Sequence, residues 1–273
     1  MPKKRKVFFL SDRTGITAET LGNSLLSQFD DIEFQRTTLP FINSPEKARA
    51  TVETINLAAS NGEPVIIFST TVNNEIRSIL RQSQASFFDP FDSYVPELEK
   101  VLQEKSLHVE GRAHGMPDVG RYESRIDAMN FSMHHDDGQT RKGLERADVI
   151  VLAPSRCGKT PVCLYMALQH GLFCANYPLT EDDMETRRLP EHLMEFRHKL
   201  FGLILSAERL QQIREERRPG SRYASLQQCL FELNEAEQMY RRFAIPFVDS
   251  TAMSIEEIAT LIMHEKGLRR QTF

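Results

Sequence analysis

The segment VIVLAPSRCGKTPVC, residues 149 to 163, constrains the fold of this chain more than any other feature. The segment from Asp148 to Leu152, apolar after its first residue, predicts a buried strand. A helix is predicted to follow, with Pro161 in its first turn, where a missing N–H costs little. A strand that stops at a loop carrying glycine, lysine and a hydroxyl residue before a helix is typical of phosphate-binding loops. The order of these parts therefore predicts an α/β domain with an anion-binding loop.

Each residue type in this loop has an expected role. Gly158 permits close backbone approach to a phosphate, Lys159 supplies positive charge, and the hydroxyl of Thr160 is placed to hold magnesium. Arg156 adds a second cation. A plain strand-to-helix turn with a buried lysine stem is the alternative. The predicted phosphate-binding residues are Ala153, Pro154, Ser155, Arg156, Cys157, Gly158, Lys159 and Thr160.

Ala153 stands where a phosphate-binding loop usually has its first glycine. A positive φ at an alanine would cost about 1–2 kcal/mol. Pro154 follows, and a proline pushes the residue before it toward extended geometry. We therefore expect Ala153 to be the last residue of the strand and the anion cradle to begin at Ser155.

Short apolar runs alternate with helical patterns over the first ninety residues and again after residue 147. This rhythm predicts parallel sheets covered by helices on both faces. We expect an α/β protein in which an N-terminal Rossmann-like layered domain, residues 1–140, precedes a P-loop kinase-like α/β domain, residues 141–273. A stretch at about 109–140 carries glycine, proline and histidine with little periodicity, and it is expected to be a long irregular connection.

Composition excludes several classes of protein. A net charge of −4 and a pI near 6.1 argue against general nucleic-acid binding. The basic PKKRKV at residues 2 to 7 matches a nuclear-import or nucleic-acid pattern, but it runs into an apolar strand and is better explained as its lead-in. No apolar run reaches the ~18 residues of a membrane span. With no apolar signal-peptide core after the N-terminus either, we expect a cytoplasmic protein. The four cysteines form no CxxC pair, so we expect reduced thiols.

Two adjacent acids, Asp136 and Asp137, precede a glycine just upstream of the loop. One of these carboxylates could orient an acceptor hydroxyl during phosphoryl transfer, and the alternative is a solvated turn. His134 and His135 beside them could shuttle protons, although core or surface histidines are the simpler interpretation.

Other polar residues leave two interpretations open. Asp12, with Ser11, follows the first strand, where α/β sheets commonly bind ligands, but a helix cap explains it equally well. Asp249 follows a short apolar strand and is a weaker magnesium candidate. A cluster of arginines suits either phosphate binding or an exposed, salt-bridged helix end: Arg214, Arg217, Arg218 and Arg222.

Several separated motifs, in one order, resemble the bacterial phosphoenolpyruvate synthase regulatory proteins. They are SDRTGITAETLG near the start, HDDG at 135 to 138, SRCGKTP in the loop, HKLFGL at 198 to 203 and IREERRPGSRYASLQQC from Ile213. The resemblance runs from about Val7 to near the C-terminus. The family motif has glycine at the position of Ala153.

The resemblance implies a bifunctional enzyme. Such proteins phosphorylate a threonine of phosphoenolpyruvate synthase with ADP, inactivating it, and remove the phosphate with inorganic phosphate, releasing pyrophosphate. It implies ADP and phosphate as substrates. Because phosphoryl transfer needs cations, a metal ion and a group that orients the acceptor, we expect Mg²⁺ as cofactor and Lys159, Arg156, Asp136 and Asp137 as catalytic candidates. A homodimer is a possible assembly. The alternatives are a regulator of pyruvate, phosphate dikinase with the same chemistry, a P-loop kinase of a small molecule, and an adaptor that uses the basic N-terminus.

Overall fold

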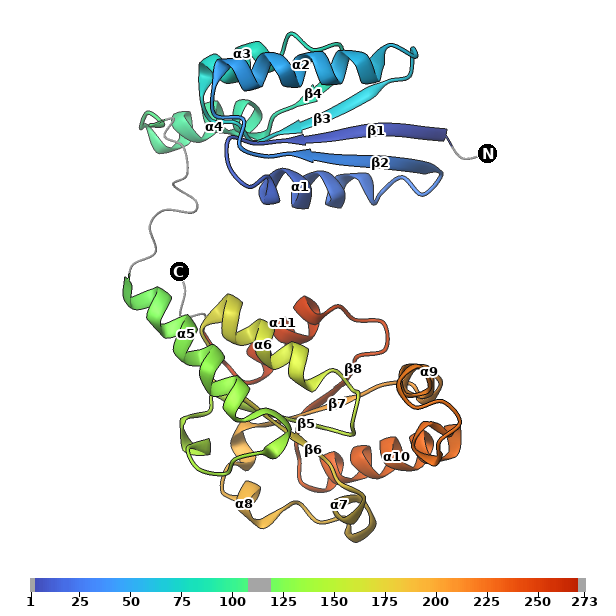
Figure 1. Cartoon of the computed structure of the whole chain (residues 1–273). Coiled ribbons are helices and arrows are strands. Elements are labelled where there is room, and N and C mark those ends of the chain that lie inside the picture. The colour runs from blue at the N-terminus through green and yellow to red at the C-terminus, as the bar shows by residue number, and fades with distance from the viewer. Residues whose placement is uncertain (1–2, 108–118, 270–273) are drawn as a thin grey trace. The chain divides into compact units, whose positions relative to one another are not determined.

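A computed structural model describes residues 3–107 and 119–269. The chain divides into two compact units, Met1–Gly115 and Met116–Phe273, which are described separately below (Figure 1). Both are α/β units built on a four-stranded parallel sheet, which confirms the predicted fold class.

The first unit has the strand order β2-β1-β3-β4. Its strands are β1 (Lys3–Leu10), β2 (Ile32–Leu39), β3 (Val65–Ser69) and β4 (Ser86–Phe88), and its helices are α1 (Ile16–Leu26), α2 (Pro45–Ala59), α3 (Asn74–Leu80) and α4 (Pro90–Leu102). Alternate residues of β1 point to opposite faces. Phe8 and Leu10 pack with residues of α2 and α3, whereas Val7 and Phe9 pack with residues of α1. Figure 1 shows these helices on the two faces of the sheet.

The basic N-terminal segment lies in β1, as the lead-in interpretation predicted. Lys3 pairs with Ile32 of β2, and Lys6 pairs with both β2 and β3. The segment is therefore part of the sheet, and its exposed lysines lie at the start of a strand.

The second unit has the strand order β6-β5-β7-β8. Its strands are β5 (Val149–Ala153), β6 (Cys174–Pro178), β7 (Leu200–Ile204) and β8 (Phe247–Asp249). Its helices are α5 (Val119–His134), α6 (Lys159–His170), α7 (Glu181–Thr186), α8 (Glu191–Met194), α9 (Ala207–Arg217), α10 (Leu226–Arg242) and α11 (Ile255–Glu265), with short 3₁₀ turns η2 (Asp136–Gly138), η3 (Leu144–Arg146), η4 (Arg197–Lys199) and η5 (Arg222–Ala224).

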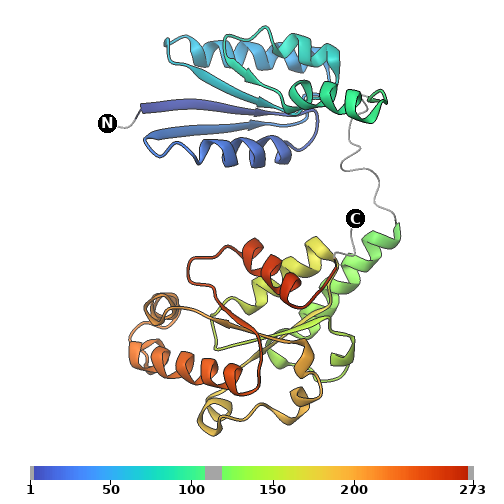
Figure 2. The same cartoon turned by 180° about the vertical axis from the view of Figure 1, so that it is seen from behind.

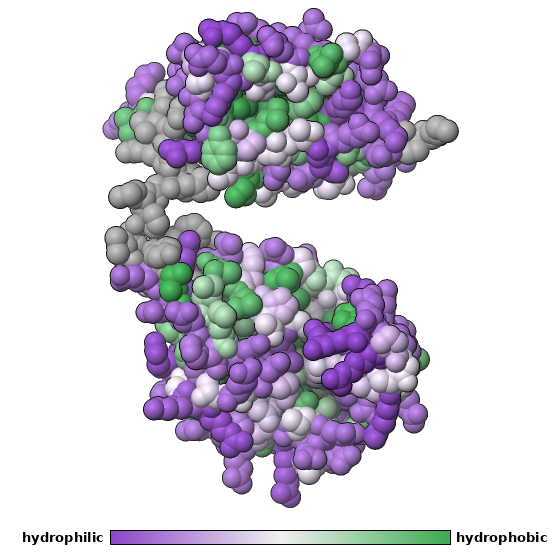
Figure 3. Space-filling view, viewed as in Figure 1, coloured by the Kyte–Doolittle hydropathy of each residue, from purple (hydrophilic) through white to green (hydrophobic). Residues whose placement is uncertain are grey.

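Both faces of the second sheet are covered by helices. Val149 and Val151 pack in one buried cluster with residues of α6 and α11, and Ile150 and Leu152 pack in another with residues of α10. Figure 2 shows α11 and α10 on opposite sides of this sheet. The face seen in Figure 3 is mainly hydrophilic on each unit, with apolar residues in small groups. Because each sheet is enclosed, its functional groups are expected at strand ends and in loops.

The expected irregular connection at 109–140 is wrong over most of its described length. Residues 108–118 lie outside the described residues, but Val119–His134 form α5. Its buried positions Ala128, Phe131 and Ser132 have the spacing of one helix face, and His135 extends it. The division of the chain after Gly115 also places this helix in the second unit, 25 residues before the predicted boundary at 140.

Candidate functional site

The loop between β5 and α6 has the backbone geometry expected of an anion site. β5 ends at Ala153, which is fully buried, pairs with Pro178 of β6 and has no positive φ, as predicted from Pro154. Positive φ angles occur instead at Arg156, 76°, and at Gly158, 86°. Turns of this kind direct successive N–H groups toward one side of the chain.

Within the described residues, none of the backbone N–H groups of residues 155–160 donates a hydrogen bond. Gly158 caps α6 without a side-chain partner. The positive end of the helix dipole lies at the same place. The loop therefore presents unpaired donors at a helix N-terminus, which is the arrangement that binds phosphate.

Lys159 lies inside the loop. Its side chain is buried, and Nζ donates to the carbonyl oxygen of Pro154 at 3.2 Å. Burial lowers the pKa of Lys159, and the negative charges of Asp137 and Asp136 oppose that shift. A buried ammonium group is stabilised when an anion lies beside it.

Asp136 and Thr160 are joined directly. The Thr160 hydroxyl donates to Asp136 Oδ1 at 2.7 Å, and Asn176 Nδ2 donates to the same oxygen at 2.5 Å. Asn176 also accepts from the backbone N–H of Asp137 at 2.9 Å, and its own N–H donates to the carbonyl of His135 at 3.1 Å. This strand residue therefore fixes the turn at three points, and sequence reasoning missed it.

Asp137 differs from its neighbour in exposure and in partners. Its backbone has a φ of 50°, and its carboxylate is exposed, with no hydrogen bond or ion pair to any described residue. Gly138, with a φ of 67°, packs so closely that an added Cβ would lie 3.0 Å from the Tyr177 ring. The aspartate pair is thus divided into one held carboxylate and one free carboxylate.

The two histidines beside this turn have the simpler roles. His135 is buried and stacked on Phe131, with ring nitrogens 2.9 and 3.0 Å from the carbonyl oxygens of Phe131 and Lys142. His134 is exposed, and its Nδ1 lies 2.7 Å from the carbonyl oxygen of Asn130. His135 therefore anchors the segment, and the ring nitrogens of both histidines have their hydrogen-bond partners outside the loop residues 153–160.

A small cavity of about 180 Å³ lies between α5 and α6, beside the hydrogen bond between Asp136 and Thr160. The residues lining it are Ser132, Met133, Asp136, Thr160, Cys163 and Leu164. This volume is below the range of about 300–1,000 Å³ that is usual for small-molecule pockets. It is thus too small for a whole nucleotide.

The arginine cluster does not converge on one site. Arg214 is fully buried, and its guanidinium contacts both carboxylate oxygens of Glu232, at 3.1 and 2.5 Å. Arg217 and Arg218 are exposed, and Arg222 pairs with Glu181 at 2.8 Å. Of the four, Arg214 alone reaches the loop, where it donates to the carbonyl of Ser155 at 2.9 and 3.3 Å.

The remaining candidates have local structural partners. Asp249 accepts from the N–H and the hydroxyl of Thr251, at 2.9 and 2.5 Å, and so closes the turn after β8. Cys157 is buried, which raises its thiol pKa to about 12 and keeps it neutral. All four cysteines are buried and unpaired, as expected.

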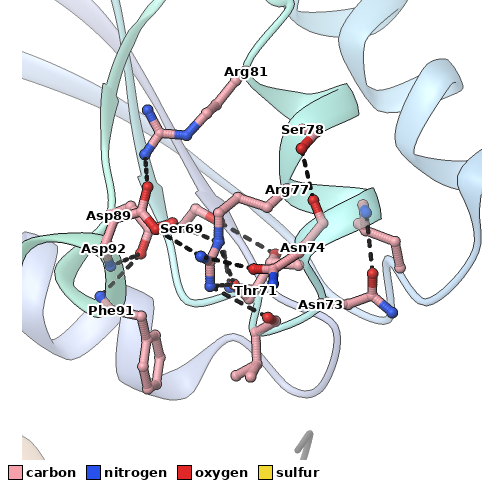
Figure 4. A network of polar contacts seen from close by, with 12 residues as sticks. Ser69, Thr71, Asn73, Asn74, Arg77, Ser78, Arg81, Asp89, Phe91 and Asp92 are labelled. Carbon is pink, nitrogen blue, oxygen red and sulfur yellow. Dashed lines mark hydrogen bonds and ion pairs between the residues drawn. The ribbon is translucent and has the colours of Figure 1, made fainter. Parts of the chain in front are cut away.

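In the first unit, Asp12 joins two strand ends. Its carboxylate accepts from the N–H of Val72 at 3.1 Å, which links the loop after β1 to the loop after β3. Beside this loop the buried Arg77 contacts Asp89 at 3.1 Å, Asp92 at 2.6 Å and the carbonyl of Thr71 at 2.9 Å (Figure 4). Burial raises the pKa of Asp89. This network ties α3, α4 and the β3 loop together.

The chain is similar to known proteins over nearly its whole length. Residues 7–263 match the family described as kinase/pyrophosphorylase. A relative from Alkalilimnicola ehrlichii is 50% identical over 271 residues, covering 99% of this chain and 98% of the relative. Relatives from Legionella pneumophila strain Corby and Pseudomonas aeruginosa strain LESB58 are also 50% identical, covering 98% and 99% of this chain and 99% of each relative. All three carry the provisional name phosphoenolpyruvate synthase regulatory protein.

A solved LacI transcriptional regulator from Lactobacillus brevis aligns with 90% of this chain and 96% of its own, at 12% identity and a TM-score of 0.22. A score this low supports no inference about fold or function. No helix in the described part of the chain is long and apolar enough to cross a membrane.

The family match covers most of the chain, and the relatives align with it over nearly their whole length. The chain therefore belongs to the kinase/pyrophosphorylase family.

Proposed function

We propose that this protein phosphorylates a threonine of phosphoenolpyruvate synthase with ADP, which inactivates the synthase. In the opposing reaction it removes that phosphate with inorganic phosphate and releases pyrophosphate. Family membership supports an activity of the kinase or phosphotransferase type. The names of the relatives point to the synthase. The observation that carries the proposal is the set of unpaired N–H groups of residues 155–160, together with the buried ammonium of Lys159.

Phosphoryl transfer needs positioning and charge stabilisation more than covalent help from the protein. The loop amides and Lys159 supply both for the diphosphate of ADP. Arg156 is exposed, and its guanidinium has no hydrogen bond or ion pair within the described residues, so it is available to a phosphate oxygen. These groups stabilise the negative charge that is shared among the phosphoryl oxygens during transfer.

Asp137 is the better candidate to orient the acceptor, because its carboxylate is free whereas Asp136 is held by Thr160 and Asn176. In the forward reaction the threonine oxygen attacks the β-phosphorus of ADP, the bond to AMP breaks, and the threonine proton passes to Asp137. In the opposing reaction an oxygen of inorganic phosphate attacks the phosphothreonine phosphorus. The threonine oxygen then leaves with a proton, and pyrophosphate is formed.

Thr160 and Asp136 fit the expected magnesium. Mg²⁺ prefers oxygen ligands and commonly binds through one or two protein groups plus substrate phosphates. The Thr160 hydroxyl and the second carboxylate oxygen of Asp136 supply such ligands at the helix start. When bound, the ion neutralises phosphate charge. The hydrogen bond between the two side chains keeps both ligand groups together.

The test uses purified protein, phosphoenolpyruvate synthase and ADP labelled at the β-phosphate. We expect label on a synthase threonine, AMP as co-product and loss of synthase activity, with Lys159→Ala abolishing all three. Lys142→Ala, an exposed lysine near the turn, is the matched control and keeps activity. Label on pyruvate, phosphate dikinase alone, or on a small molecule without a protein acceptor, would replace this proposal with one of the alternatives.

A further inference from the structure

We propose that Tyr223 is a positioning residue for the bound phosphate. Its hydroxyl donates to Ser155 Oγ and thereby directs the hydrogen of the Ser155 hydroxyl to the anion. The inference rests on the proposed function in one respect, since it takes residues 155–160 as the phosphate site. Tyr223 lies outside the phosphate-binding loop, 68 residues from Ser155 along the chain, and neither the loop motif nor the description of the matched family gives it a role.

Tyr223 is held in place at several points. Its hydroxyl lies 2.9 Å from Ser155 Oγ. Its carbonyl accepts from Arg214 Nη1 at 3.1 Å, and its ring centroid lies 4.2 Å from the Arg214 guanidinium carbon. Arg214 is fully buried and is held in turn by Glu232. A phenol fixed in this way presents its hydroxyl at one place, which a freely rotating side chain cannot do.

The hydrogens available decide which hydroxyl donates. Tyrosine and serine hydroxyls each carry one hydrogen and can also accept. If Tyr223 donates to Ser155, the serine hydrogen remains for another acceptor, and no described residue accepts it. If Ser155 donates instead, its lone pairs face the site and repel phosphate oxygens. A bound anion therefore selects donation from Tyr223 to Ser155, and a charge-assisted hydrogen bond from Ser155 to phosphate follows.

The same unit also fixes the backbone. Arg214 donates twice to the carbonyl oxygen of Ser155, at 2.9 and 3.3 Å. In a trans peptide the carbonyl and the next N–H point in opposite directions. Holding the Ser155 carbonyl toward Arg214 therefore turns the N–H of Arg156 away from it, where it stays unpaired. Tyr223 thus orients the side chain of Ser155, and Arg214 orients its backbone.

The experiment compares Tyr223→Phe, Ser155→Ala and the double variant with the wild type. The measurements are ADP binding by calorimetry, the KM for inorganic phosphate, kcat and Tm. Tyr223→Phe keeps the ring on Arg214 and removes only the hydroxyl. We expect ADP affinity to fall about three- to tenfold and the phosphate KM to rise by a similar factor, which is the effect of one lost hydrogen bond. Tm should fall by a few degrees at most, because a single hydrogen bond contributes little to the unfolding free energy.

The double variant separates positioning from a structural role. If Tyr223 acts through Ser155, Tyr223→Phe has no further effect on ADP affinity in the Ser155→Ala protein. Additive losses, or an unchanged ADP affinity in Tyr223→Phe, would overturn the inference. Tyr94→Phe, an exposed tyrosine on α4, is the matched control and should behave as wild type. Wild-type protein that binds no ADP would instead contradict the proposed function.

Discussion

The hydroxyl of Thr160 donates a 2.7 Å hydrogen bond to the carboxylate of Asp136, which joins the first turn of α6 to the turn that follows α5. These two residues lie 24 positions apart in the chain. The bond holds the turn at Asp136 beside the start of α6, which is where the proposed function brings a donor phosphate and an acceptor hydroxyl together. It also occupies one oxygen of Asp136, whereas the carboxylate of the neighbouring Asp137 has no hydrogen bond to any described residue, so the proposed function assigns the two acids different roles.

Replacing each aspartate by asparagine should separate these roles. Asp137→Asn is expected to lower kcat about 10²–10⁴-fold in both directions, because it removes the carboxylate that accepts the threonine proton in the proposed reaction. Its ADP affinity should stay near that of the wild type. Asp136→Asn should instead raise the Mg²⁺ concentration needed for half-maximal rate. Steady-state kinetics in both directions, with Asp182→Asn of α7 as an exposed control, check this. Equal effects of both variants on kcat alone would contradict the division.

Lys159→Met is expected to stabilise the protein while it abolishes ADP binding. Burial lowers the pKa of Lys159, so keeping its ammonium charged opposes folding when no anion is bound. The unfolded chain binds this proton more tightly, and the free energy of unfolding should therefore rise with pH between the lowered folded pKa and the ordinary value of about 10.4. The variant should lack that rise. Urea unfolding at several alkaline pH values measures it, and equal pH slopes in both proteins would contradict it.

Local chemistry made part of the site predictable. Pro154 restricts Ala153 to extended geometry, and the structure has Ala153 at the end of β5. The alternation of apolar runs with helical spacing gave both parallel sheets. Asn176 could not be predicted, since its contact with Asp136 spans 40 residues and depends on how β6 pairs with β5. The helix α5 was missed because the two glycines and the proline just before it masked its helical spacing.

The pair of Arg214 and Glu232 gives a prediction about stability. Arg214→Met leaves the Glu232 carboxylate buried without its partner, which should cost about 3–5 kcal/mol of unfolding free energy. The double variant Arg214→Met/Glu232→Met should recover most of that loss, because two apolar side chains can fill the same space. Its ADP affinity should stay low, since nothing then holds the Ser155 carbonyl. Urea denaturation and calorimetry measure the two effects, and a double variant that binds ADP as the wild type does would contradict the second.

Ala153→Gly introduces the residue that phosphate-binding loops usually have at this position, and we expect it to leave ADP affinity unchanged. Ala153 lies in the strand with an ordinary φ, so its methyl group causes no strain that glycine could relieve. Glycine should instead lower the unfolding free energy by about 1–2 kcal/mol, through backbone entropy and the lost buried methyl. Ala175→Gly, at a buried position of the neighbouring strand β6, should show the same loss and serves as the control. A tenfold gain in ADP affinity in Ala153→Gly alone would mean that the cradle begins at residue 153 and not at Ser155.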